Sequence, residues 1–148
     1  MIQEIKNLIY SQYKPDDKVG CFFSLFDGNG NLLVSSGVLT ADKFLDDLIN
    51  LLYNGVIKSQ ENKTKHVIID VVKEITPQND VNQFLQMDPK VNWVLLAETS
   101  WTKTGVMLPN MRWITTMKQV VAGIKSKYQL QWDVTISTFT VNELVLDR

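Results

Sequence analysis

The sequence is poor in cysteine, balanced in charge and free of long hydrophobic runs. Its single cysteine, Cys21, excludes an internal disulfide framework in a chain of 148 residues. Fifteen basic and sixteen acidic side chains leave a net charge of −1, so a nucleic-acid partner is not expected. No apolar run approaches the roughly 18 residues that cross a bilayer, which argues against a membrane partner. Residues 1–6 lack the pattern of a secretion signal, so the cytoplasm is the expected compartment.

The composition that remains is that of a globular protein. Hydrophobic residues make up 45% of the chain, which is enough to build a well-buried core. The length is near the commonest size for one domain, and no repeat or linker divides it. We therefore expect a single domain over residues 1–148.

The firmest local signal is the tetrapeptide Asp27-Gly28-Asn29-Gly30. Its residues tolerate positive φ angles, and it separates an aromatic apolar run at residues 19–26 from a second short run at residues 31–37. This pattern predicts a β-hairpin.

The spacing of apolar residues predicts the other elements. Helical spacing occurs at residues 2–9, 44–53, 81–85 and 114–124, and strand-like runs occur at residues 66–72, 91–97, 105–108 and 132–141. Thr40 and Asp42 are candidate N-caps for the second helix, and residues 59–65 are polar enough for an exposed loop. The expected fold class is α+β, a mainly antiparallel sheet with β-hairpins, flanked by three to four helices.

The hairpin turn resembles the start of a calcium loop, because Asp27, Asn29 and Asn31 alternate. Such a loop needs glycine at its sixth position and glutamate at its twelfth, where this chain has Leu32 and Val38. Turn formation is the better interpretation, and no metal site is expected.

Cys21 and His66 are the only residues of their kinds, so one nucleophile–base pair is arithmetically possible. Cys21 lies inside an aromatic run, where a free cysteine acts as a small buried hydrophobe. His66 stands at the head of a predicted strand, as an ordinary edge residue does. The sequence therefore names no catalytic residue and no cofactor.

Four short segments follow one another along the chain after residue 18. They are Asn29-Gly30-Asn31-Leu32, Val72-Lys73-Glu74-Ile75-Thr76-Pro77, Gly105-Val106-Met107-Leu108-Pro109 and Lys127-Tyr128-Gln129-Leu130. Their order resembles that of a diverged AMMECR-type domain, a family with a strand ending in D-G-x-L, a V-x-x-I-x-P strand exit, a G-x-x-L-P hairpin and a K-x-x-L before its last strand. The resemblance implies the family's fold and an unassigned activity.

The chain departs from the family at the signature Leu-Arg-Gly-Cys-Ile-Gly that follows the hairpin turn. Here the segment reads Leu32-Leu33-Val34-Ser35-Ser36-Gly37. The arginine that would recognise an anion and the cysteine that would supply a thiolate are both absent. We therefore expect a non-catalytic interaction or small-molecule-binding domain rather than an enzyme.

Candidate binding residues follow from the two hairpins and one exposed aromatic residue. A pocket is expected where the hairpins converge, and a tryptophan in a predicted turn would need a partner surface. These candidates are Ser35, Ser36, Gly37, Trp101, Pro109 and Asn110. Another protein or a second copy of the chain is the expected partner.

The opening order of helix, strand, turn, strand and helix also resembles a roadblock or longin-like module. Proteins of that kind dimerise or hold GTPases. The elements after residue 91 exceed what that fold requires, so it is the alternative interpretation.

Overall fold

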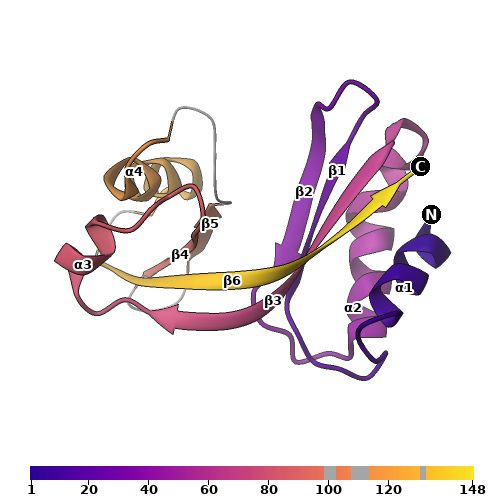
Figure 1. The fold of residues 1–148 in the computed structure, drawn as a ribbon, viewed down its shortest axis with the longest axis horizontal. Coiled ribbons are helices and arrows are strands. Elements are labelled where there is room, and N and C mark those ends of the chain that lie inside the picture. The colour runs from indigo at the N-terminus through magenta and orange to yellow at the C-terminus, as the bar shows by residue number, and fades with distance from the viewer. Residues whose placement is uncertain (99–102, 108–113, 131–132) are drawn as a thin grey trace. The chain divides into compact units, whose positions relative to one another are not determined.

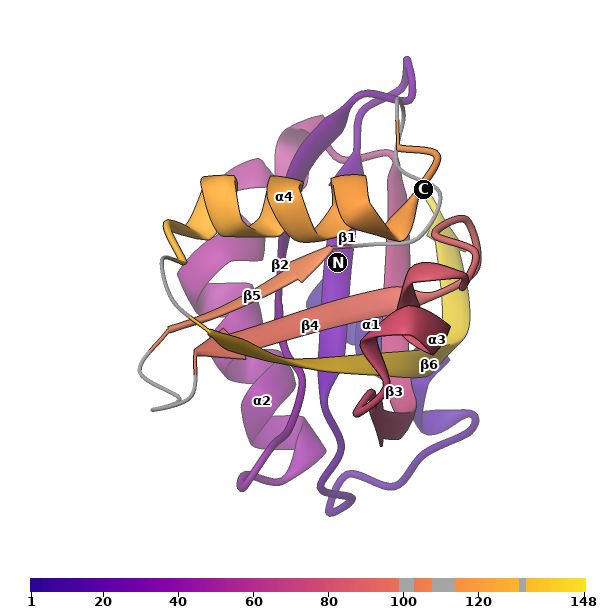
Figure 2. The ribbon, with the colours of Figure 1, turned by 90° about the vertical axis from the view of Figure 1, so that its left-hand side faces the viewer.

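A computed structural model describes residues 1–98, 103–107, 114–130 and 133–148. The protein is α+β and contains a six-stranded antiparallel sheet with strand order β2-β1-β3-β6-β4-β5 (Figures 1 and 2). This confirms the expected fold class. The elements are α1 (Ile2–Tyr10), β1 (Cys21–Phe26), β2 (Leu32–Val38), α2 (Leu45–Leu52), η1 (Tyr53–Ile57), η2 (Lys58–Lys63), β3 (His66–Pro77), α3 (Val81–Leu85), β4 (Trp93–Glu98), β5 (Thr104–Met107), α4 (Met117–Tyr128) and β6 (Val134–Asp147).

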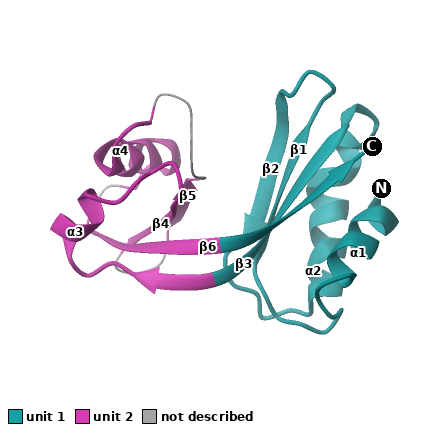
Figure 3. Ribbon diagram, viewed as in Figure 1, with its two compact units in different colours: residues 1–73, 141–148 teal, residues 74–140 magenta. Residues whose placement is uncertain are grey.

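The chain forms two compact units (Figure 3). Unit 1 contains Met1–Lys73 and Val141–Arg148, and unit 2 contains Glu74–Thr140. The long strands β3 and β6 each contribute residues to both units. The single domain over residues 1–148 stays a prediction.

In unit 1, the hairpin forms where the sequence indicates it. Gly30 adopts a φ of 81°, a conformation that a side chain would strain. The Asp27 carboxylate accepts hydrogen bonds from the backbone N–H groups of Asn29 and Asn31, each at 2.9 Å. These bonds lower the pKa of Asp27, the bonds from Asn31 most of all. The turn thus uses the oxygen atoms that a calcium loop would have offered to a cation.

One face of the unit 1 sheet packs on α1 and α2. Alternate residues of β1 and β3 point to that face, and the buried core there comprises Ile5, Ile9, Cys21, Phe23, Leu25, Leu45, Leu48, Ile49, Leu52, Ile57, Val67, Ile69, Val71 and Leu144. Both helices lie on the same side of the strands in Figure 3. The neighbouring residues of each strand therefore point to the opposite face.

Two local expectations in unit 1 are wrong. The helix after the hairpin begins at Leu45, and neither Thr40 nor Asp42 caps it. The N–H groups of Leu45 and Asp46 instead donate to the carbonyls of Asp17 and Pro15, so a preceding loop satisfies the helix end.

Residues 59–65 are also not simply an exposed loop. The helix that starts at Leu45 continues through η1 and η2, which ends at Lys63. Glu61 in this segment accepts a hydrogen bond from the Tyr53 hydroxyl at 2.7 Å. It also forms an ion pair with the amino terminus at 3.1 Å. Long-range polar contacts therefore order a stretch whose sequence has no apolar period.

Unit 2 places α4 alongside β5 and β4 (Figure 2). A capping box starts α4, in which Thr116 and Gln119 exchange hydrogen bonds, and a left-handed Gln129 with φ 57° ends it. Its buried side chains pack against α3 and β4. The core comprises Phe84, Val94, Leu96, Met117, Val120, Ile124 and Leu130.

Candidate functional site

The face of the unit 1 sheet opposite the two helices carries an unusual set of polar side chains. Ser24 and Ser35 pair across β1 and β2, and Phe22 pairs with both Gly37 and Asp70. Paired residues point to the same side of an antiparallel sheet, so these side chains share one face. We call Ser24, Ser35, Asp70 and Glu143 the polar sheet face.

Two hydroxyl groups meet at its centre. Ser24 Oγ lies 3.2 Å from Ser35 Oγ, and either atom can donate. Ser24 is buried, whereas Ser35 is exposed at the side of the pair nearer the sheet edge. The pair can therefore offer a hydroxyl to a group that approaches from β2.

Gly37 has a packing role on this face. A Cβ atom at this position would lie 2.2 Å from the carbonyl oxygen of Cys21 and 2.8 Å from the Phe22 ring. The ring of Phe22 therefore leans over Gly37. The absence of a side chain lets β2 and the aromatic ring approach each other.

Asp70 is the most unusual residue of the polar sheet face. Its exposed fraction is only 3%, and no described residue forms a hydrogen bond with its Oδ1 atom. Its neighbours along β3 on the same face are Ile68 and Val72, and Phe22 is its partner across β1. This burial is the main reason that the pKa of Asp70 rises from 3.8 to about 6.

Glu143 is the second carboxylate of this face. Asp147 bonds to His66 at 2.6 Å, and the backbone N–H of Arg148 donates to the carbonyl of Lys65 at 2.8 Å. The same antiparallel register, continued along the strands, places Glu143 opposite Asp70. Repulsion from the charge of Glu143 adds to the increase in the pKa of Asp70.

The structure does not bring Cys21 and His66 together on this face. Cys21 is buried on the other face, among the helices, and burial raises the pKa of its thiol to about 12. That confirms the prediction that Cys21 acts as a core residue. His66, the single histidine, bonds to Asp147 and not to either serine. What the face does offer is an acceptor without a donor and two hydroxyl groups.

The structure describes three of the six predicted site residues, and two of them lie on this face. Ser35 and Gly37 lie on it, whereas Ser36 pairs with Phe23 and points toward the side of the helices. Trp101, Pro109 and Asn110 lie outside the described residues. The sequence-based search missed Asp70, although a lone acidic residue in the run His66-Val-Ile-Ile-Asp-Val-Val72 was a signal for it.

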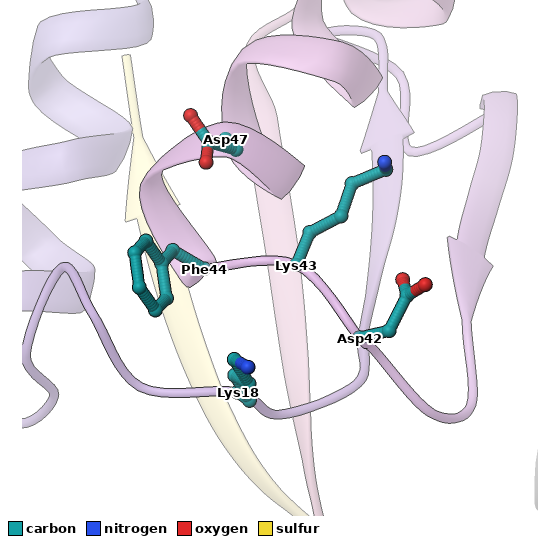
Figure 4. A pocket seen from close by; sticks show the side chains of 5 residues that line it. All are labelled: Lys18, Asp42, Lys43, Phe44 and Asp47. Atoms are coloured by element: carbon teal, nitrogen blue, oxygen red, sulfur yellow. The ribbon is translucent and has the colours of Figure 1, made fainter.

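Unit 1 also contains a shallow hollow of about 310 Å³ at the start of α2 (Figure 4). Lys18 lies under the half-exposed ring of Phe44, with its Nζ atom 5.5 Å from the ring centre, while Asp42 and Lys43 extend away from that ring. Two lysines and two aspartates, with Asp47 as the second, leave the hollow neutral. The carbonyls of Asp17 and Pro15 already accept the N–H groups of Leu45 and Asp46 at the start of α2.

Comparisons with known proteins show the fold alone. No family model matches the sequence, and a search of the curated proteins finds no match. The structure is similar to the crystal structure of an uncharacterised protein from Pyrococcus horikoshii, with a TM-score of 0.71 and 14% sequence identity. The similarity covers 97% of this chain and 88% of that protein.

Two kinds of feature are absent from the part of the chain that the structure describes. No cluster there contains three or more histidine, cysteine, aspartate or glutamate side chains able to hold a metal ion. Nor does any helix in those residues have the length and hydrophobicity needed to cross a bilayer.

Proposed function

We propose that the chain is a non-catalytic, cytoplasmic binding domain of AMMECR type. We further propose that its polar sheet face binds a small ligand that donates a hydrogen bond to Asp70. The observation that carries this proposal is the buried Oδ1 atom of Asp70, with which no residue in the described part of the chain forms a hydrogen bond. Leaving such an acceptor unsatisfied costs about 1–3 kcal/mol, and a bound donor recovers part of that cost.

The chemistry of the face favours a cationic donor such as an amine or a guanidinium group. Asp70 is mostly ionised at pH 7, because its pKa of about 6 lies below that value. Glu143 adds a second negative charge on the same face, and it is exposed. On β2, the Ser35 hydroxyl can accept or donate a further hydrogen bond. A planar guanidinium group matches carboxylate oxygens well.

The assignment to the AMMECR type has support from where the resembling segments fall. Asn29 and Gly30 form the hairpin turn, and Pro77 ends β3. Gly105 lies in β5, and Leu130 follows α4, where its N–H donates to the Lys125 carbonyl. These positions are the support for the AMMECR part of the proposal, and Leu108 and Pro109 of the third segment lie outside the described residues.

The binding proposal can be tested with methylguanidinium as the probe. We expect it to shift the backbone amide signals of Phe22, Ser24 and Asp70 in a saturable way, whereas acetate, a matched anion, leaves them unchanged. Binding should strengthen from pH 5 to pH 7, because Asp70 loses its proton over that range.

Variants of two aspartates give the matched comparison. Asp70→Asn removes the charge and should abolish the shifts, whereas Asp16→Asn, at an exposed position, should retain them. Equal binding by the Asp70→Asn variant and the unaltered protein would contradict the proposal.

A further inference from the structure

Unit 2 contains an apolar groove that the polar sheet face of unit 1 does not involve. The groove has a volume of about 330 Å³ and lies between α3 and α4. We name it the α3–α4 groove. Its lining consists of Val81, Phe84, Leu85, Lys118, Val121, Ala122, Lys125 and Ile136.

Large apolar side chains remain exposed at this groove. Val81 is 56% exposed and Leu85 is 43% exposed, although both lie on a helix whose third apolar residue, Phe84, is fully buried. On the short α3, Phe84 therefore packs in the core of unit 2, whereas Val81 and Leu85 remain exposed at the groove. Exposed apolar residues gathered around a hollow are typical of a docking surface.

The charges at the groove are all of one sign. Lys118 and Lys125 line it, and no ion pair joins either lysine to an acid in the described residues. Asp80, just before α3, does not line the groove, and its carboxylate accepts hydrogen bonds from the backbone N–H groups of Asn82 and Gln83 at the start of that helix. The groove is thus positive, in a chain whose net charge is −1.

The spacing of the two lysines indicates the shape of the partner. They stand seven residues apart on α4, which is two helical turns or about 10 Å. Val121 and Ala122 lie between them on the same side of the helix. A partner helix lying along α4 would meet this pattern with acidic residues at positions i and i+7 and apolar residues at i+3 and i+4.

We propose that the α3–α4 groove docks an acidic amphipathic helix from another protein. A second copy of this chain fits less well, because a two-fold interface would bring Lys118 and Lys125 against the same lysines. This inference does not depend on the proposed ligand of the polar sheet face, since the two sites share no residue.

The probe is a synthetic helical peptide of about 18 residues with glutamates at positions i and i+7 and leucines at i+3 and i+4, long enough to form a helix on binding. It should bind the full chain and shift the amide signals of residues 81–85 and 118–125. A peptide with lysines in place of the two glutamates should bind at least about tenfold more weakly, because like charges then meet. Raising the salt concentration should weaken binding of the acidic peptide.

Three variants separate the groove from the rest of α4. Lys118→Glu and Lys125→Glu should each weaken binding about fivefold to tenfold, as a reversed charge at the rim of an interface does. Lys127→Glu is the matched control, because Lys127 lies over the Tyr128 ring and does not line the groove. Leu85→Ala should weaken binding without a dependence on salt.

Four results would overturn the proposal. They are no binding of the acidic peptide at millimolar concentration, equal binding of the acidic and basic peptides, unchanged affinity in both groove variants, and self-association of the chain through this groove. Decanoate, an apolar chain with one carboxylate, tests whether the groove binds a small molecule instead of a helix. Shifts in the groove with decanoate but none with the peptide would also overturn it. Unchanged amide signals in β4 and β5, which belong to unit 2 and do not line the groove, show that each variant is folded.

Discussion

The free energy of unfolding should fall as the pH rises from 4 to 7, and Asp70 should be the cause. In the folded protein the pKa of Asp70 is about 6, against 3.8 for an ordinary aspartate. The folded state therefore holds the proton over a range in which the unfolded state releases it. The stability associated with the protonated side chain is fully present below pH 3.8 and is lost as the pH rises through 6.

The size of the effect follows from the pKa values. Each pKa unit corresponds to about 1.4 kcal/mol, so the difference at Asp70 amounts to about 3 kcal/mol at most. Asp70→Asn keeps the shape of the side chain but cannot ionise. At pH 7 this variant should be more stable than the unaltered protein by up to about 3 kcal/mol, and at pH 4 the two should differ little.

Urea denaturation monitored by the fluorescence of the four tryptophans measures this difference at several pH values. Asp16→Asn, at an exposed position, is the control and should follow the unaltered protein. A direct titration of the Asp70 carboxyl carbon by NMR gives the pKa itself. A stability that stays level or increases between pH 4 and 7, or an Asp70→Asn variant with the same pH dependence as the unaltered protein, would refute the reasoning.

Four other substitutions test the fold. Gly37→Ala should destabilise the protein by about 1–3 kcal/mol in urea denaturation, since its Cβ would meet backbone atoms of β1, whereas Gly55→Ala, where a Cβ meets nothing within 4 Å, should stabilise it by about 0.4–1 kcal/mol. Thr116→Ala removes half of a capping box, so calorimetry should show a loss of about 1 kcal/mol. Tyr10→Phe removes a hydrogen bond that lowers the pKa of Asp46, so the variant should be less stable at pH 7. That difference should shrink below pH 3.8, where Asp46 takes up its proton. Equal losses at both pH values would contradict that explanation.

Local sequence patterns predicted the elements wherever local interactions form them. The hairpin at residues 27–30 and the helix α4 are such cases, because glycine conformation, capping and apolar spacing act within a few residues. The patterns failed where distant residues supply the contacts. The start of α2 depends on carbonyls of Pro15 and Asp17, and the helical turns up to Lys63 depend on contacts with the amino terminus.

The candidate site was predictable only in part, for the same reason. Ser35 and Gly37 come a few residues after the hairpin turn, so the sequence placed them on the returning strand of the hairpin. Their relation to Asp70 and Glu143 depends on the pairing of β1 with β3 and of β3 with β6, which spans most of the chain. Strand register over such separations is not encoded in any short motif.

The division of unit 1 into two chain segments has a consequence for synthesis. Its last segment, Val141–Arg148, contributes the buried Leu144, and it follows all of unit 2 in the sequence. During translation, unit 2 is therefore complete in sequence before unit 1 has its final strand. The amino-terminal part of unit 1 therefore cannot complete its fold before unit 2 has been synthesised. Until β6 arrives, the edge of β3 in unit 1 is open to pairing with other chains, which makes this interval the one in which a chaperone would matter most.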